Sequence, residues 1–447
     1  MPALVFHPPP CKSAFARALL LALLRRGRTR LDYTLEEGAT LAADVQVAVD
    51  CVRRLGAELR HGRDANGAFV EVESRGWPRA APVRSIDCGE SATMARMLSA
   101  LTAALGGEVR VDGGAQLRRR QLGASLVDVL QGLGASIEWN GEAGCLPLRV
   151  VGRTARTPLD SKVDTAHSSQ GASGLLLALG VHGARLQVDG PPAYLRLTAA
   201  WMRAFGVDLR SEGDLYVVDR TLPAGDVALR IPADPSAACF FLAYVAGHRL
   251  EAEVRGLEPN GLGAAHPDLA FFADLAALGV RVEEQASGLR VDARAASLDG
   301  DGRGLDVELV LDERPDAVAP LTALLSSRRG CHVLRSSKLR HKESDRIQVL
   351  VDGLRRLGFA AEAFADGFRF EGRPRGPRAR QLDAARGSAA PLRVASAGDH
   401  RMAMAFRILA SIHGVDVAVD DEACVDKSFP SFQLELRRWD ELRARRS

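Results

Sequence analysis

Lysine is rare in this chain, and the few lysines mark segments where chemistry is expected. Only five of the 59 Lys and Arg residues are lysine. A guanidinium cannot release its proton near neutral pH as an ammonium can, so a position that keeps lysine is a candidate for binding or proton transfer. Chance retention is the alternative for any one of them. The five are Lys12, Lys162, Lys338, Lys342 and Lys427.

Two segments place polar groups where an apolar helix begins. Lys12 and Ser13 stand at one such start, and Arg17 follows one turn later. Cations oppose the positive end of a helix dipole, whereas an anion bound there is stabilised by it and by the free N–H groups. Residues 168–170, Ser-Ser-Gln, precede a second apolar helix, and capping explains only one of their three polar side chains. Both segments therefore predict a phosphate or polyol ligand; an N-capping serine with solvated neighbours is the alternative.

The densest cluster of cations lies within residues 338–346. Lys342 and Arg346 are four residues apart, which predicts neighbours on one helix face, and such a pair costs a few tenths of a kcal/mol unless an anion lies between them. Glu343 and Asp345 could supply that anion. Two acids do not balance all the cations of the segment, however, so we expect a dianionic ligand.

Further polar residues stand at helix starts or in loops of the second half of the chain. Asp316 opens an apolar helix, Arg401 lies at another helix start, and Lys427 lies in a loop closed by Pro430. Capping alone could explain Asp316. Together the segments predict a cleft that binds more than one anionic group, with Asp316 and Glu343 as the carboxylates available for proton transfer.

A repeated pattern of elements must position these residues. Six times a helix pattern ends at a glycine suited to the left-handed conformation, and an alternating strand pattern follows. A common helix ending would explain one copy, but six near-regular copies predict an internal repeat. We expect an α/β fold with two lobes of three units each. The six glycines are Gly56, Gly134, Gly206, Gly279, Gly358 and Gly414.

Composition excludes several classes of protein. The chain has 447 residues, 47% hydrophobic and 26% charged, which suits two or three globular domains. A net charge of +3 gives no reason to expect nucleic acid or a membrane surface as partner. The apolar run 18–24 lies inside an Arg-bounded helix pattern, not in a leader with a cleavage site, and it is far shorter than a membrane span.

The cysteines and the missing motifs narrow the chemistry. Seven scattered cysteines without a C-x-x-C spacing predict neither disulfides nor a zinc site, and they suit the cytoplasm. No Walker loop, dinucleotide-binding glycine motif, His/Cys metal cluster or nucleophile elbow is present in the sequence. The missing motifs give no reason to expect a metal or a cofactor. We also expect the enzyme to be a monomer.

Several ordered motifs resemble the enolpyruvyl transferase family over almost the whole chain. They are KESDR (342–346), DHRMAM (399–404), SSQ (168–170), KS…R (12–17), DPSAA (234–238) and KSFP (427–430). The resemblance implies two lobes, each of three βαβαββ units. It also implies that the chain starts in one lobe, crosses to build the other and returns. Lobe I would hold residues 1–11 and 230–447, and lobe II residues 12–229.

The resemblance also implies a reaction and its residues. The family transfers the enolpyruvyl group of phosphoenolpyruvate; the branch matched here uses the 5-hydroxyl of shikimate-3-phosphate and releases phosphate, in the pathway to chorismate and the aromatic amino acids. The implied catalytic residues are Lys12, Asp316 and Glu343. The implied shikimate-3-phosphate ligands are Lys12, Ser13, Arg17, Ser168, Ser169, Gln170, Tyr194, Asp316, Lys338 and Lys342. The implied phosphoenolpyruvate ligands are Lys12, Ala92, Arg120, Gln170, Arg346, Arg401 and Lys427.

The sequence departs from the family pattern at several of these positions. Cys11 replaces a serine, Pro191 replaces another, and Lys338 replaces an asparagine. The phosphoenolpyruvate arginine matches Arg120, with Arg119 as the alternative. Family members with alanine at the position of Ala92 resist the inhibitor glyphosate. The resemblance therefore implies that this enzyme resists it as well.

Two other functions stay open at this point. One is enolpyruvyl transfer to UDP-N-acetylglucosamine by an enzyme of the same fold. Enzymes of that branch carry a reactive cysteine, and none is present in the matching residues 111–121. The other is a binding protein without catalysis, against which the presence of both lysines and carboxylates argues.

Overall fold

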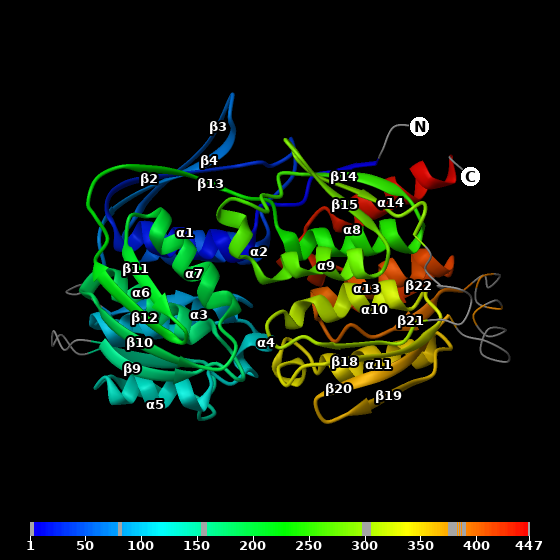
Figure 1. Ribbon diagram of the computed structural model, residues 1–447. Coiled ribbons are helices and arrows are strands. Elements are labelled where there is room, and N and C mark those ends of the chain that lie inside the picture. The colour runs from blue at the N-terminus through cyan, green and yellow to red at the C-terminus, as the bar shows by residue number, and fades with distance from the viewer. Residues whose placement is uncertain are drawn as a thin grey trace.

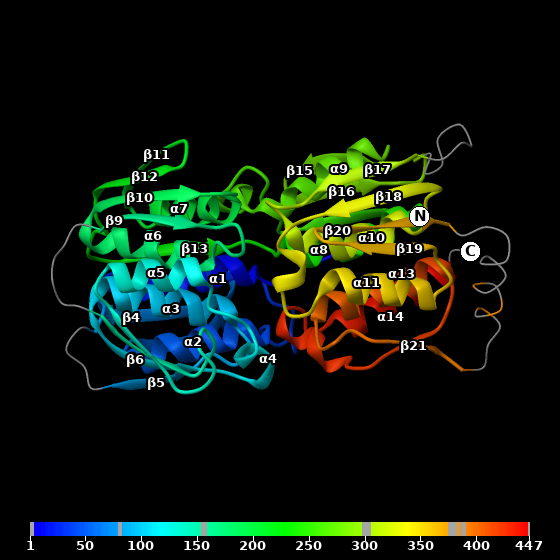
Figure 2. The same cartoon turned by 90° about the horizontal axis from the view of Figure 1, so that it is seen from below.

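The computed structural model shows two lobes joined side by side (Figure 1). It describes residues 4–78, 83–152, 159–296, 305–373, 382, 384, 386 and 390–445. Helices α1 to α7 lie in one lobe, here lobe II, and helices α8 to α14 lie in the other, lobe I, as the view from below also shows (Figure 2). No helix in the described ranges is long and apolar enough to cross a membrane.

Three small sheets build lobe II, each with one parallel and two antiparallel strand pairs. Their strand orders are β13-β2-β4-β3, β5-β6-β8-β7 and β11-β12-β10-β9. The strands are β2 (Arg26–Tyr33), β3 (Glu58–Asp64), β4 (Gly67–Arg75), β5 (Arg84–Asp87), β6 (Gly107–Asp112), β7 (Ser136–Trp139), β8 (Leu148–Gly152), β9 (Leu159–Asp164), β10 (Ala184–Asp189), β11 (Asp208–Glu212), β12 (Leu215–Arg220) and β13 (Val227–Ile231).

Lobe I repeats the arrangement. Its sheets have the orders β1-β14-β16-β15, β17-β18-β20-β19 and, within the described residues, the pair β21-β22. The strands are β1 (Leu4–Phe6), β14 (Glu251–Arg255), β15 (Arg281–Gln285), β16 (Gly288–Asp292), β17 (Val307–Val310), β18 (Gly330–Arg335), β19 (Ala361–Phe364), β20 (Gly367–Gly372), β21 (Leu392–Val394) and β22 (Val417–Val419). The six sheets confirm the predicted class, an α/β fold of repeated units.

Glycine ends a helix in each of the six units, as the sequence predicted. Gly56, for example, follows α2 (Ala43–Arg54) with φ +99°, a conformation that costs side chains with a Cβ about 1 kcal/mol or more. The other five predicted glycines also have positive φ. They follow α5 (Ala124–Gly132), α7 (Ala193–Ala204), α9 (Phe271–Ala277), α11 (Arg346–Arg356) and α13 (His400–His413).

The more apolar helices form the centre of each lobe and point toward the other lobe. In lobe II these are α1 (Lys12–Leu24), α3 (Ala92–Leu105) and α6 (Gln170–His182), whose side chains are nearly all buried. In lobe I they are α8 (Pro235–Gly247), α10 (Val318–Leu325) and α13, which pack on one another. Because the first residues of α1, α3 and α6 line the cleft described below, three positive helix ends face it from lobe II.

The two crossings between the lobes lie against each other. Cys11 N donates to Pro232 O at 2.9 Å, and Asp234 N donates to Pro9 O at 2.8 Å. The Asp234 carboxylate accepts from Ser236 N (2.8 Å) at the start of α8 and from Lys12 N (3.1 Å) at the start of α1. One buried carboxylate therefore caps a central helix of each lobe.

Candidate active site

A cleft between the lobes gathers nearly all the predicted site residues. Together with adjoining open solvent it holds about 920 Å³ of space not occupied by atoms. Its walls include fifteen of the sixteen predicted residues, with Arg346 the exception: Lys12, Ser13, Arg17, Ala92, Arg120, Ser168, Ser169, Gln170, Tyr194, Asp316, Lys338, Lys342, Glu343, Arg401 and Lys427. Lobe II contributes the first nine and lobe I the other six, so the site is complete only where the lobes meet.

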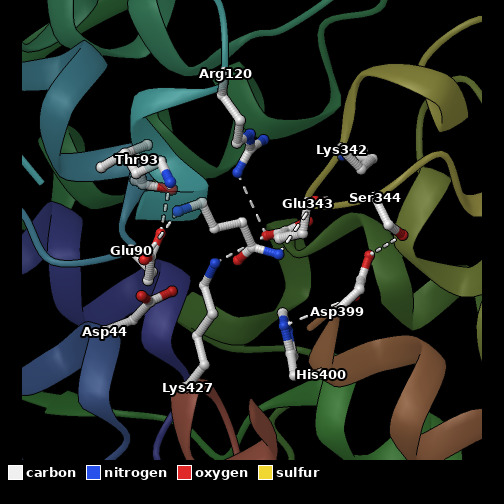
Figure 3. A network of polar contacts seen from close by, with 12 residues as sticks. Asp44, Glu90, Thr93, Arg120, Lys342, Glu343, Ser344, Asp399, His400 and Lys427 are labelled. Atoms are coloured by element: carbon white, nitrogen blue, oxygen red, sulfur yellow. Dashed lines mark hydrogen bonds and ion pairs between the residues drawn. The ribbon is translucent and has the colours of Figure 1, made fainter. Parts of the chain in front are cut away.

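Glu343 lies at the centre of a ring of cations from both lobes (Figure 3). One of its oxygens is 3.3 Å from Lys427 Nζ and 3.6 Å from an Arg120 nitrogen, and the other accepts from Arg346 at 2.9 Å. Burial alone would raise the pKa of Glu343, but Lys427, Arg120 and Arg346 outweigh it and hold the pKa well below its usual value. The carboxylate is therefore ionised while the cleft holds no ligand.

Asp316 is a second carboxylate held by cations. It stands in the short helical turn Pro315–Ala317 before α10 and pairs with Arg346 (2.7 Å), Arg401 (3.1 Å) and Lys342 (3.4 Å). The Tyr194 hydroxyl from lobe II donates to it at 3.5 Å. Burial opposes ionisation, yet Arg401, Lys342 and Arg346 keep the pKa of Asp316 well below its usual value.

Arg346 lies behind the lining residues. Its side chain is 1% exposed and bonds to Asp399 at 2.8 Å as well as to Asp316 and Glu343. Three carboxylates around one guanidinium fix the positions of the two that face the cleft. Helix α11 begins at Arg346 and is capped by Asp345, so the prediction that Lys342 shares this helix is wrong; Lys342 lies in the turn before it.

The lobe II wall supplies hydrogen-bonding groups and further cations. Lys12 Nζ pairs with Asp44 at 2.9 Å. Arg17 is buried and bonds only to uncharged acceptors, among them Thr198 Oγ1 (2.8 Å) and Ser13 O (2.8 Å), and burial lowers its pKa to about 10. Ser169 stands at the N-cap of α6, yet its side chain makes no capping hydrogen bond. Its hydroxyl makes no hydrogen bond with the residues that the structure describes, whereas Ser168 Oγ accepts from Gln170 N at 3.3 Å. One serine therefore bonds to the helix start and the other is available to a ligand.

Lys338 is a buried ammonium on the cleft wall without an ion pair to any described residue. Its residue is 6% exposed. Burial and the neighbouring Lys342 lower its pKa to about 8, against the weaker opposing effect of Asp312, Glu313 and Asp164. An anionic ligand bound beside Lys338 would stabilise the charged form of its ammonium group.

Several cleft residues carry no motif of their own and were not predicted from the sequence. Arg96 of α3 is 7% exposed and bonds to Gln170 Oε1 (2.6 Å) and to the carbonyls of Gln121 (2.5 Å) and Leu122 (3.0 Å). Asp44, Thr93 and the two histidines His167 and His341 also line the cleft. Their local sequence resembles any helix or loop, so only the fold identifies them.

Glu90 lies just before α3 and holds a short helix at the edge of the cleft. Its carboxylate accepts from Gln116 N (3.2 Å) and Leu117 N (2.6 Å) and so caps the short helix α4 (Ala115–Arg118). Gln116 in turn donates to the lobe I carbonyls of Glu343 (3.2 Å) and Gly398 (3.3 Å). Glu90 therefore supports a contact between the lobes. Arg120, in the turn after α4, lines the cleft, whereas Arg119 is not among the lining residues.

One group of side chains in the described residues has the spacing of metal ligands. Donor atoms of Cys11, Asp234 and His266 lie within 4.8 Å of one another. The Asp234 carboxylate already accepts three backbone N–H groups, however, and His266 Nδ1 accepts one from Asp268 at 3.2 Å. A neutral imidazole whose Nδ1 is an acceptor carries its proton on Nε2, so this group offers no ready set of lone pairs for a metal ion.

Comparisons with known proteins agree with this geometry. The sequence profile of the family described as EPSP synthase (3-phosphoshikimate 1-carboxyvinyltransferase) matches residues 5–436. Two relatives named 3-phosphoshikimate 1-carboxyvinyltransferase, from Thermococcus kodakarensis and Methanoculleus marisnigri, are 31% and 30% identical. The alignments cover 97% and 96% of this chain, and 96% and 94% of the relatives.

Solved structures show the same fold. An EPSP synthase from Acinetobacter baumannii has a TM-score of 0.69 at 23% identity, covering 98% of this chain and 96% of its own. The enolpyruvyl transferase NikO from Streptomyces tendae also has a TM-score of 0.69, at 18% identity, covering 98% and 94%. These matches do not favour the UDP-N-acetylglucosamine branch or a non-catalytic protein. The chain belongs to the EPSP synthase (3-phosphoshikimate 1-carboxyvinyltransferase) family.

Proposed function

We propose that this enzyme joins the enolpyruvyl group of phosphoenolpyruvate to the 5-hydroxyl of shikimate-3-phosphate and releases phosphate. Its relatives are named for this transfer, which belongs to aromatic amino-acid biosynthesis. The observation that carries the proposal is the pair of carboxylates, Asp316 and Glu343, each ionised within a ring of cations at the junction of the lobes. Two trianionic substrates fit such a site, and two carboxylates suit a reaction that moves two protons.

We assign phosphoenolpyruvate to the cations around Glu343. Lys12, Arg120 and Lys427 would hold its phosphate, and Arg401 its carboxylate, with Ala92 and Gln170 against its other side. We propose that Arg346 also binds the carboxylate of phosphoenolpyruvate. For this, the side chain of Asp316 or Glu343 must turn away from Arg346. Binding the phosphate would offset the cations that hold the pKa of Glu343 down. Glu343 can then carry the proton that the addition step needs.

We assign shikimate-3-phosphate to the lobe II wall and the facing part of lobe I. The free hydroxyl of Ser169 and the unpaired ammonium of Lys338 support this assignment. Asp316 would accept the proton of the 5-hydroxyl. The proposed ligands are Lys12, Ser13, Arg17, Ser168, Ser169, Gln170, Tyr194, Asp316, Lys338 and Lys342.

The proposed addition and elimination balance through these residues. The 5-oxygen bonds to C2 of phosphoenolpyruvate as its proton passes to Asp316, and C3 takes a proton from Glu343 to become a methyl group. In the second step Glu343 removes a proton from that methyl group and the C2–C3 double bond re-forms. Phosphate leaves C2 with a proton from Lys12, while Asp316 returns its own proton to solvent and Lys12 regains one.

We also propose that the chain crosses between the lobes near residues 11 and 230; because β13 pairs with β2, lobe II extends to Ile231. We further propose that the enzyme acts as a monomer in the cytoplasm. The support for a monomer is that residues of one chain complete the cleft. The support for the cytoplasm is the absence of a disulfide among the seven cysteines, all of which are free.

Release of phosphate from the two substrates tests the proposal. We expect turnover that requires both substrates and a loss of roughly 10²-fold or more in kcat for Glu343→Gln, which cannot transfer a proton. Glu308→Gln, at an exposed carboxylate paired with Arg335, is the matched control. Wild-type protein without turnover would contradict the proposed function, and full turnover in Glu343→Gln would remove that residue from the mechanism.

A further inference from the structure

A second cavity adjoins the active-site cleft on the side of α4 and α5. Together with adjoining open solvent it holds about 1430 Å³ of space not occupied by atoms. It shares six lining residues with the cleft, so the two spaces meet along one wall: Arg96, Arg120, His167, Ser168, His341 and Lys342. Arg120, proposed above as a phosphoenolpyruvate ligand, therefore lies at its inner end.

The charges around this cavity are almost all positive. Arginine and lysine contribute five side chains to its walls, and Asp164 is the one carboxylate among the lining residues. Three of the five cations have carboxylate partners: Arg340 with Asp345 (2.5 Å), Lys342 with Asp316 and Arg120 with Glu343. Arg96 bonds only to uncharged oxygens.

Arg119 is the remaining cation of the cavity. It is exposed, and its side chain makes no hydrogen bond or ion pair with the residues that the structure describes. It stands in the turn after α4, between two arginines whose side chains make other contacts. Arg118 forms two hydrogen bonds with Asp112 (2.8 and 2.7 Å), and Arg120 enters the cleft.

The floor of the cavity is apolar. Leu122, Leu126 and Val163 form it and are buried. A low-dielectric wall under charges of one sign concentrates the electric field and raises the local concentration of an oppositely charged substrate. Such a surface does not by itself hold a phosphate tightly, since only Arg119 offers a free charge at the rim.

We infer that this cavity is a capture site for phosphoenolpyruvate, in which Arg119 draws the trianion in and passes it to Arg120. The inference rests on the proposed function. It assigns Arg119 a part in the association step and none in the chemistry. Rim charges of this kind change association rates and their dependence on salt.

The test compares Arg119→Gln and Arg118→Gln with wild type over a range of salt concentration. We expect Arg119→Gln to lower kcat/KM for phosphoenolpyruvate about threefold to tenfold near 10 mM ionic strength, where charges act over about 30 Å. Near 1 M salt the difference should vanish, because the screening length falls to about 3 Å. The kcat should stay within twofold of wild type, and Arg119→Lys should restore most of the loss.

Four results would overturn the inference while leaving the proposed function intact. They are an unchanged kcat/KM at low salt, a loss that persists at high salt, an equal loss in Arg118→Gln, and an equal loss in kcat/KM for shikimate-3-phosphate. Absence of turnover in the wild-type enzyme would instead contradict the proposed function.

Discussion

At the scale of single residues, the buried ammonium of Lys338 gives the site a pH dependence. Its pKa of about 8 lies below the ordinary 10.5, so it is charged below pH 8 and loses its charge as the pH rises past 8. A bound shikimate-3-phosphate anion favours the charged form and raises the pKa, so binding takes up a proton above pH 8.

We predict that the affinity for shikimate-3-phosphate is constant between about pH 7 and 7.5 and falls severalfold between pH 8 and 9.5. Calorimetric titration at each pH measures it. Lys338→Arg keeps a charge at all these values and should flatten the profile. Lys162→Arg, at an exposed lysine paired with Asp189, should leave the profile as in wild type. The same slope in the Lys338 variant would exclude Lys338 as its cause.

Ala92 sets the space at the phosphoenolpyruvate end. It is the first residue of α3, is 4% exposed and lines the cleft beside Thr93. A methyl group at this point leaves less room for glyphosate, which is longer than phosphoenolpyruvate. We predict a resistant wild-type enzyme and at least about tenfold stronger inhibition of Ala92→Gly, which is about 1.4 kcal/mol of binding. The measurement is the glyphosate inhibition constant of wild type and of Ala92→Gly at the same phosphoenolpyruvate concentration. Equal constants would contradict this role for Ala92.

At the scale of elements, one carboxylate holds the starts of α1 and α8. Asp234 is 3% exposed, and its oxygens accept from backbone N–H groups of both helices. We predict that Asp234→Ala lowers the free energy of unfolding by about 2 kcal/mol or more, since a single lost cap costs up to about 2 kcal/mol. Denaturant unfolding measures it, with Asp128→Ala on the exposed face of α5 as control. Equal stability of the two variants would show that the caps are not needed.

The elements were more predictable from sequence than their contacts. Each glycine helix ending was predicted because it depends on local backbone geometry, and all six have positive φ. The motif residues were predictable because the chemistry restricts their types. The position of Lys342 was not, because a capping aspartate starts α11 four residues later than the charge spacing implied. Asp44 and Arg96 reach the cleft through the packing of α1, α2 and α3, which no local pattern encodes.

At the scale of the whole molecule, strand β1 belongs to lobe I, the same lobe as the C-terminal helix α14. The ring centroid of Phe6 in β1 lies 4.5 Å from that of Phe241 and 5.8 Å from that of Trp439 in α14 (Phe432–Ala444). Phe6→Ala should therefore destabilise lobe I by about 3 to 5 kcal/mol.

Hydrogen exchange separates the effects on the two lobes. We expect Phe6→Ala to speed exchange in α8 and α14 while α3 and α6 keep wild-type protection. Phe15→Ala, in the core of lobe II, should give the opposite pattern. Uniform loss of protection in both variants would show that the lobes unfold as one unit.

The pairing of β1 also sets an order of events during synthesis on the ribosome. Lobe II draws its core from residues 11–231, so this lobe can fold as soon as that stretch has emerged. Strand β1 is made before lobe II, yet its partner β14 begins only at Glu251. The strand thus waits unpaired beside a finished lobe, and the active site forms only when lobe I closes over a strand that was made before lobe II.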